Sequence, residues 1–165
     1  MDLHFETVTA ENRRQMEALR LFPNQKGFVE SVADCLTEAD ESDRWRPVGI
    51  YDRQTLVGFA MYGFFPEASP AGQLWLDRLL IDRQHQGKGY GSAALSRLLP
   101  RLTSEYRKDT VYLSVYDTNR PAIRLYEKFG FRFNGAHDIN GEKVMVYHPP
   151  KSLSPAKKAS RLGSL

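Results

Sequence analysis

The amino-acid sequence predicts an α/β protein, built as a central mixed sheet of about seven strands flanked by about four helices. Three observations lead to this class. Residues 1–148 contain segments with the two-residue period of strands and segments with the 3.6-residue period of helices. Several expected strands follow one another directly, which differs from the regular alternation of a doubly wound fold. The 165 residues, 41% hydrophobic and 26% charged, suit one globular domain.

The first half of the chain is expected to form three strands and two helices. Residues 3–8 alternate apolar and polar side chains, as a half-buried strand does. Thr9 has a side-chain oxygen suited to capping the next helix, and Pro23 ends that helical region. A short turn at Asp52–Thr55 separates two strands. The expected elements are a strand at Leu3–Val8, helices at Ala10–Arg20 and Gln25–Asp40, and strands at Arg46–Tyr51 and Leu56–Phe64.

The second half is expected to form four strands and two helices. A loop at Pro66–Gly72 leads into a strongly apolar strand. Pro121 suits the first turn of a short helix, and Asn140-Gly141 is a tight-turn signal between the last two strands. The expected elements are a strand at Gln73–Ile81, a helix at Gly89–Tyr106, a strand at Thr110–Tyr116, a helix at Arg120–Phe129, and strands at Phe131–Gly135 and Lys143–His148.

The positive charge of the chain is concentrated at its C-terminal end. The formal net charge is +3, but residues 149–165 contain four basic residues and no acidic one. This Pro-, Ser- and Lys-rich segment has little apolar surface to bury, so we expect a mobile tail. Its alternative interpretation is a weak contact with nucleic acid or a partner protein. The remaining residues carry one more acid than base, so no nucleic-acid partner is expected.

Several other classes of protein are excluded by composition. No apolar run approaches the ~18–20 residues that span a bilayer, and the first eleven residues lack a signal-peptide pattern. Cys35 is the only cysteine, so an internal disulfide is excluded, and the four histidines show no metal-ligand spacing. We therefore expect a soluble cytoplasmic protein without a metal or membrane partner. Its oligomeric state is open, with a homodimer as one alternative.

The sharpest local signal is a glycine-rich segment between a strand and a helix. Gly87, Gly89 and Gly91 occupy alternate positions just before the helix. Glycines let a ligand approach the backbone, and a helix N-terminus offers free N–H groups to a pyrophosphate. The spacing fits neither a P-loop nor the G-x-G-x-x-G dinucleotide fingerprint. The alternative is a glycine turn without a ligand.

Residues 86–91, Gln-Gly-Lys-Gly-Tyr-Gly, match the Q/R-x-x-G-x-G/A motif of the GNAT acetyltransferase superfamily. A later set of residues is similar to that family's second half-motif: Leu113-Ser-Val115, Asn119, Ala122, Tyr126 and Gly130-Phe131. Over residues 3–148 the chain resembles small bacterial spermine/spermidine N-acetyltransferases, at stretches such as Val57–Gly63, Trp75–Arg78 and Asn140–Met145.

The resemblance implies a GNAT fold over residues 1–148, with the sheet splayed at its fourth and fifth strands. It further implies acetyl-CoA as cosubstrate, lying between strands Trp75–Ile81 and Val111–Tyr116. The backbone of strand Trp75–Ile81 would bind the pantetheine, and the glycine-rich segment would bind the pyrophosphate. Asn119 would bind the cofactor just after strand Val111–Tyr116. The implied cofactor-binding residues are Leu79, Leu80, Ile81, Gln86, Gly87, Lys88, Gly89, Tyr90, Gly91, Ser92 and Asn119.

Two residues are candidates for the chemistry. The resemblance places a general acid at Tyr126, and a phenol of pKa near 10 is protonated at neutral pH; the alternative is a packing aromatic. Asp77 interrupts an apolar strand, on the face that a two-residue period would share with Trp75, Leu79 and Ile81. It is expected to bind the substrate ammonium and accept its proton, or else to form a salt bridge with Arg78 or another base. Some relatives carry a glutamate base where this chain has Ser114.

The best substrate clue is a run of acidic residues. Glu30, Asp34, Glu38 and Glu41 share one face of the expected second helix. Such a row repels itself and suits a polycation; the alternative is a solvated acidic face. Glu30, Asp34 and Asp77 are therefore expected to bind substrate, together with Trp45, which either packs on a methylene chain or belongs to the core. Cys35 lies on the apolar side of the helix and is expected to be structural.

Together these features predict an acetyl-CoA-dependent N-acetyltransferase acting on spermine or spermidine. The amine would attack the thioester directly in a ternary complex, without a covalent acyl-enzyme. Two alternatives stay open. In the first, the acceptor is another amine, such as a drug, an amino acid or a protein N-terminus. In the second, the chain is a non-catalytic module that binds acyl-CoA.

Overall fold

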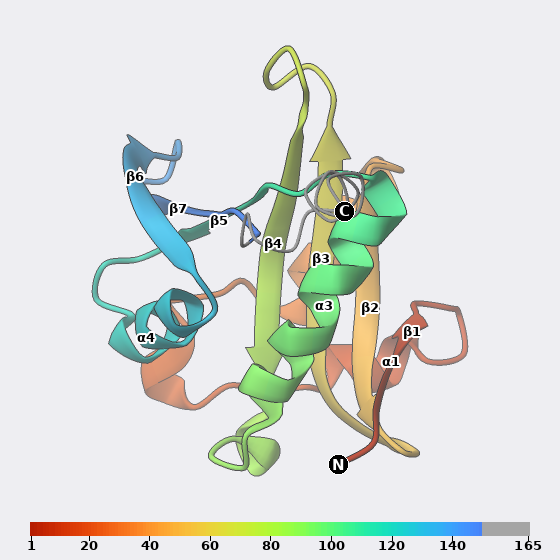
Figure 1. Ribbon diagram of the computed structural model, residues 1–165. Coiled ribbons are helices and arrows are strands. Elements are labelled where there is room, and N and C mark those ends of the chain that lie inside the picture. The colour runs from red at the N-terminus through yellow and green to blue at the C-terminus, as the bar shows by residue number, and fades with distance from the viewer. Residues whose placement is uncertain (150–165) are drawn as a thin grey trace, which may run out of the picture.

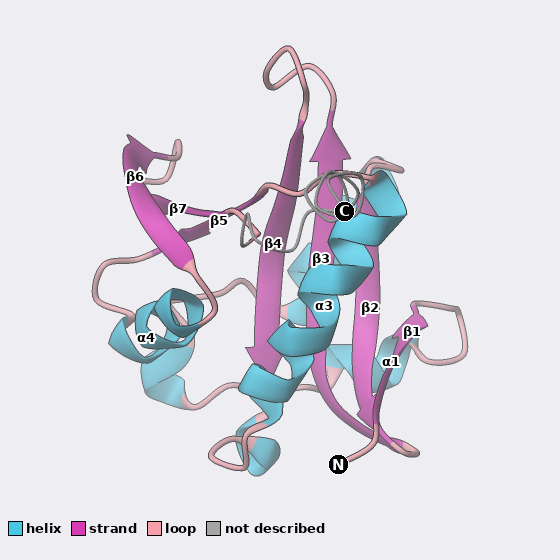
Figure 2. Cartoon of the chain, in the orientation of Figure 1, coloured by secondary structure: helices cyan, strands magenta, loops and turns pink. Residues whose placement is uncertain are grey.

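The computed structural model describes residues 1–149, and Figures 1 and 2 show the arrangement of its elements. The basic tail expected at 149–165 lies, beyond Pro149, outside the described residues. The strands are β1 (Leu3–Thr7), β2 (Trp45–Asp52), β3 (Thr55–Phe65), β4 (Gln73–Ile81), β5 (Val111–Val115), β6 (Phe131–His137) and β7 (Lys143–Tyr147). The helices are α1 (Arg13–Glu17), α2 (Val32–Glu41), α3 (Tyr90–Tyr106) and α4 (Arg120–Lys128), with short 3-10 turns η1 (Pro23–Gln25) and η2 (Arg83–His85).

All seven strands form one mixed sheet in the order β1-β2-β3-β4-β5-β7-β6. Every neighbouring pair is antiparallel except β4 and β5, which are parallel. These two strands pair only at Leu74–Val111 and Trp75–Tyr112, and then diverge. The predicted fold class is thus confirmed, including the splay at the fourth and fifth strands.

Helices cover both faces of the sheet, and each face has its own core. In Figure 2, α3 lies across the near face of β2, β3 and β4, and α1 and α2 lie behind them. Buried residues of α3, such as Leu95 and Leu98, pack with Leu74 and Leu76 of β4, and α4 adds its apolar side to this core. On the other face, Met16 of α1 and Leu36 of α2 pack with Leu80 of β4. The site described below lies where the sheet divides.

The first two helices are shorter than the sequence predicted. The first covers Arg13–Glu17 instead of Ala10–Arg20, and the second begins at Val32 instead of Gln25. Ser31 caps the second helix, because its Oγ accepts a hydrogen bond from the backbone N–H of Asp34 at 3.1 Å. Glu30 therefore precedes the helix, and the prediction that it shares a helical face with Asp34 and Glu38 was wrong.

None of the helices in residues 1–149 combines the length and apolar composition needed to cross a bilayer. Within the same residues, no three His, Cys, Asp or Glu side chains are grouped as ligands for a metal ion.

Candidate active site

A cleft of about 660 Å³ opens where β4 and β5 diverge. One wall consists of β4 and the segment that precedes α2, and the other of β5, α4 and the turn between β6 and β7. Beyond Trp75 the edge of β4 that faces β5 has no strand partner. Its backbone N–H and C=O groups are consequently available to a ligand in the cleft.

An irregularity in β4 brings two charged neighbours to the same side of the sheet. Met61 of β3 pairs with Arg78, and Tyr62 pairs with Leu76, so Asp77 is an extra residue in the ladder, a β-bulge. Leu76 and Leu79 both pack on the α3 side of the sheet. Between them, Asp77 and Arg78 face α2, where Arg78 contacts Glu38. The prediction that Asp77 shares a face with Leu79 and Ile81 was therefore wrong, because the bulge interrupts the two-residue alternation between them.

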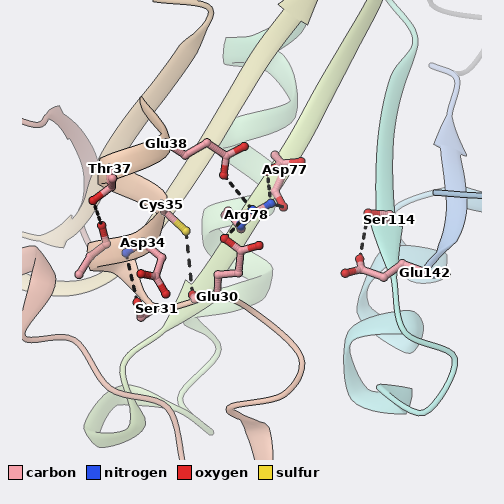
Figure 3. Close-up of polar contacts among 11 residues, drawn as sticks. Glu30, Ser31, Asp34, Cys35, Thr37, Glu38, Asp77, Arg78, Ser114 and Glu142 are labelled. Atoms are coloured by element: carbon pink, nitrogen blue, oxygen red, sulfur yellow. Dashed lines mark hydrogen bonds and ion pairs between the residues drawn. The ribbon is translucent and has the colours of Figure 1, made fainter. Parts of the chain in front are cut away.

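Arg78 is the centre of an ion-pair network, shown in Figure 3. Its guanidinium contacts the carboxylates of Asp77, of Glu38 at 3.3 Å and of Glu30 at 3.2 Å. The side chain is only 15% exposed, and its Nε is buried with no hydrogen-bond partner among residues 1–149. The salt bridge that the sequence offered as one alternative for Asp77 is thus present, and three carboxylates of the cleft share one internal cation.

Burial raises the pKa of Asp77 to about 6; the Arg78 charge lowers it, and the carboxylates of Glu38, Glu30 and Glu142 raise it. A carboxyl with such a pKa is still mostly ionised at neutral pH, yet it can hold a proton transiently. Both properties suit a group that receives an ammonium.

Two of the expected substrate residues lie away from the cleft. Asp34 is exposed on α2, and its side chain does not line the cavity. Trp45 begins β2 and packs edge-to-face on Phe65, with ring centroids 5.1 Å apart. The structure brings Glu30 and Asp77 together at the cleft. Asp34 and Trp45 lie apart from it, because the start of α2 and the path of β2 separate them from β4.

Tyr126 of α4 lines the opposite wall. Its ring packs edge-to-face on Phe131 of β6, with centroids 5.6 Å apart. Burial raises the pKa of Tyr126 to about 12, so the phenol keeps its proton at every physiological pH. Its hydroxyl hydrogen-bonds no group among residues 1–149 and is available to a ligand. Asn119, at the N-cap of α4, lines the same wall.

Glu142 is a cleft residue that the sequence did not suggest. It lies in the turn between β6 and β7, and its Oε2 accepts a hydrogen bond of 2.9 Å from Ser114 Oγ of β5. Glu142 reaches this position because β7, and not β6, pairs with β5. The sequence contained the Asn140-Gly141 turn signal, but it did not indicate that β7 of this hairpin pairs with β5.

A second cavity of about 270 Å³ lies beside the cleft and shares Phe28, Leu79 and Asn119 with it. The glycine-rich segment forms its floor. Gly87 and Gly89 have φ values of +76° and +87°, which L-residues with a side chain rarely adopt. Gly89 is the N-cap of α3, so the first N–H groups of this 17-residue helix have no partner within the helix.

Most of the expected cofactor-binding residues gather around this second cavity. Those that line it are Leu79, Leu80, Ile81, Gln86, Gly87, Gly89, Tyr90, Gly91 and Asn119. Lys88 and Ser92 do not line it. The side chain of Gln86 pairs reciprocally with Gln25, at 2.9 and 3.0 Å, and the Tyr90 hydroxyl donates to Asp52 at 2.6 Å. These two side chains fix the loop, which leaves the backbone N–H groups to bind an anion. The residues thus fit a pyrophosphate.

The thiol of Cys35 is fully buried, and burial raises its pKa to about 11. We expect iodoacetamide to alkylate native Cys35 far more slowly at neutral pH than the denatured chain, because the thiolate is the reactive form. Mass spectrometry over time measures both rates. Equal rates for native and denatured protein would refute a structural thiol.

Comparison with known proteins places these features in context. A family model described as "Acetyltransferase (GNAT) family" matches residues 9–131. The chain is 46% identical over 149 residues to the spermine/spermidine N(1)-acetyltransferase of Bacillus subtilis (strain 168), covering 88% of this chain and 98% of that protein.

Two solved structures share the fold at low sequence identity. The spermidine N-acetyltransferase from Vibrio cholerae, in complex with CoA and spermine, has a TM-score of 0.70 at 22% identity and covers 93% of this chain and 99% of its own. The AAC(6')-Ib structure in complex with parmomycin and acetyl-CoA has a TM-score of 0.77 at 17% identity, covering 94% and 99% of the two chains.

Proposed function

This chain belongs to the GNAT family of acetyltransferases, and we propose that it transfers the acetyl group of acetyl-CoA to a primary amine of spermine or spermidine. The observation that carries the substrate class is the 46% identity to a spermine/spermidine acetyltransferase, extending over 98% of that protein. The acidic wall of the cleft supports it independently, since carboxylates attract a polyamine.

The backbone would hold the cosubstrate. N–H groups from Gly87 to Ser92 at the start of α3 suit the pyrophosphate, because the helix N-terminus carries a partial positive charge. The unpaired edge of β4, from Leu79 to Ile81, suits the pantetheine amides. A β4 N–H group is also suited to polarise the thioester carbonyl, as an oxyanion hole does. Bound in this way, acetyl-CoA supplies an activated acetyl group at the junction of the two cavities.

Side chains on the two walls would then divide the remaining tasks. Asp77, with its ionised carboxyl, binds the reacting ammonium from the β4 wall. Glu30 and Glu38 extend the negative wall beyond it and bind a second cation of the polyamine. Tyr126 on the α4 wall donates its proton to the departing thiolate.

The second prediction tests the substrate class. Release of free CoA is measured against spermine, spermidine and a simple monoamine at low and high salt. We expect kcat/KM for spermine to fall more steeply with salt than for the monoamine, because salt screens charges over a Debye length of ~10 Å at 0.1 M. Glu30→Gln should raise KM for spermine with little change in kcat, since a remote charge provides uniform binding.

Glu41→Gln provides the matched control, because Glu41 is exposed at the end of α2 and does not line the cleft. It should leave the KM for spermine unchanged. Identical responses of spermine and the monoamine to salt and to Glu30→Gln would show that the acidic wall does not select polyamines. No CoA release with any amine would refute acetyl transfer itself.

A further inference from the structure

The charges of the cleft are distributed unevenly between its walls. The carboxylates that line it are Glu30, Glu38, Asp77, Asp138 and Glu142, and the cationic side chains are Lys26 and Arg78. Arg78 contacts three of the carboxylates, all on the β4 side. Glu142, on the other side, makes no ion pair with any residue of 1–149, and its polar partner is the neutral hydroxyl of Ser114. Asp138 likewise makes no ion pair in this part of the chain, but its Oδ1 accepts from the backbone N–H groups of Asn140 and Glu142. Glu142 is thus the unpaired cleft carboxylate that bonds only a neutral hydroxyl.

Glu142 is also held in place from two directions. Its backbone N–H donates to Asp138 Oδ1 at 2.8 Å, and its carbonyl accepts from the Asp138 N–H at 2.9 Å, so the turn is closed on itself. Its side chain is oriented by Ser114 at 2.9 Å. Figure 3 shows the carboxylate of Glu142 directed across the cleft toward the side of Glu30 and Asp77. A carboxylate fixed in this way is preorganised for a group that lies between the walls.

We propose that Glu142 accepts the proton of the reacting ammonium and that Ser114 is its positioning residue. The inference rests on the proposed amine acetylation and assigns a step within it. Asp77 binds the ammonium while its carboxylate stays in contact with Arg78, so a proton placed on Asp77 would break that ion pair, whereas a proton placed on Glu142 breaks none. Glu142 has its unpaired charge on the wall that also carries Tyr126.

The proton transfer begins at the ammonium group of the substrate. The Glu142 carboxylate takes one proton from R–NH3⁺ and becomes neutral, leaving R–NH2. The amine lone pair forms a C–N bond with the thioester carbonyl carbon, and the C–S bond breaks with its electron pair on sulfur. Tyr126 gives its proton to that sulfur, and the second proton lost by nitrogen restores the phenol. Glu142 returns its proton to water through the open cleft, so one proton is released for each amide formed.

The surroundings of Glu142 favour this exchange. Its burial raises its pKa; the Ser114 hydrogen bond and Arg78 lower it, and Asp138 and Glu30 raise it. The charged groups that line the same cleft are Asp138 on its own turn, Arg78 and Asp77 on β4, Glu38 on α2, and Lys26 and Glu30 before α2. The raised pKa of Glu142 is closer to the pKa of an alkylammonium, which is near 10 by analogy with lysine. The smaller difference between the two pKa values eases the proton transfer.

The test compares Glu142→Gln, Ser114→Ala and Asp77→Asn across pH, with spermidine and a monoamine as acceptors. Glutamine keeps the shape and the Ser114 contact but cannot take a proton. Glu142→Gln should lower kcat/KM about 10²-fold for both amines at neutral pH, and the loss should shrink as the pH approaches the amine's pKa. Ser114→Ala should cause a smaller loss and move the acid limb of the pH profile. Glu127→Gln, an exposed change on α4 outside the cleft, should have no effect.

Two results would overturn the assignment. A rise in KM for spermidine alone, with monoamine turnover intact, would make Glu142 a binding residue for a second cation. Loss of the acid limb in Asp77→Asn but not in Glu142→Gln would make Asp77 the acceptor. Inactivity of the wild type toward every amine would instead refute the proposed function. Thermal stabilisation by acetyl-CoA confirms that each variant is folded.

Discussion

Replacing Gly89 with aspartate is expected to abolish the thermal stabilisation that acetyl-CoA gives to the protein. Gly89 is the N-cap of α3, with a φ of +87°. A Cβ there would meet no atom closer than Met1 Cε at 4.0 Å, and aspartate is among the residues that visit this left-handed backbone region at a modest cost in strain. The fold should therefore survive, while the carboxylate takes the place that the pyrophosphate needs.

Melting curves with and without acetyl-CoA measure the effect. At a concentration of about 100 Kd, a ligand stabilises by about 2.7 kcal/mol, which raises the melting temperature by roughly 5–10 °C in a domain of this size. Gly89→Asp should show no rise. Gly89→Asn, which has the same shape without the charge, should keep part of it. An undiminished rise in Gly89→Asp would place the pyrophosphate elsewhere.

Removing the Tyr126 hydroxyl should lower kcat by about 10²–10⁴-fold, the usual contribution of general acid catalysis. Tyr126→Phe keeps the ring that packs on Phe131, so acetyl-CoA should stabilise the variant as it does the wild type. Because the pKa of Tyr126 is about 12, the phenol stays protonated through the neutral and mildly alkaline range. It should therefore contribute no alkaline limb to the pH profile in that range.

Tyr147→Phe is the matched control. Tyr147 of β7 also packs on Phe131, with centroids 5.4 Å apart, but it does not line the cleft. Its loss of a hydroxyl should leave kcat unchanged. Equal, small effects of the two substitutions would assign Tyr126 to packing, and the thiolate would then leave without a proton from this side chain.

Local patterns in the sequence predicted the elements whose signals are themselves local. Alternation, apolar runs and turn signals located the seven strands, and Gly87 and Gly89 marked a turn that needs positive φ. The start of α2 was harder, since Phe28 and Val29 continue its apolar spacing toward the N-terminus and only the cap at Ser31 marks the true beginning. Propensity alone could not choose between these two starts.

The charge arrangement of the site depends on contacts between distant segments. The network around Arg78 requires Glu30 to precede α2 and Asp77 to be a bulge, and the bulge exists only relative to β3. The approach of Glu142 to Ser114 requires β7 to insert between β5 and β6. A period read along one strand contains none of this pairing information, so the acidic row appeared uncompensated in the sequence.

The bulge in β4 makes Asp77 removable without a shift of the strand register, although Arg78 would then keep two of its three carboxylate partners. Met61 pairs with Arg78 and Tyr62 with Leu76, which leaves Asp77 without a partner on β3. Deleting Asp77 would therefore restore an ordinary ladder, with Arg78 and Leu80 still facing α2 and Leu79 still facing α3. Conversely, insertion of one residue into a regular strand at this position would add a carboxylate beside the cleft and would leave the apolar side chains on their present faces. Acceptor preference can thereby change in one genetic step while the two cores keep their packing.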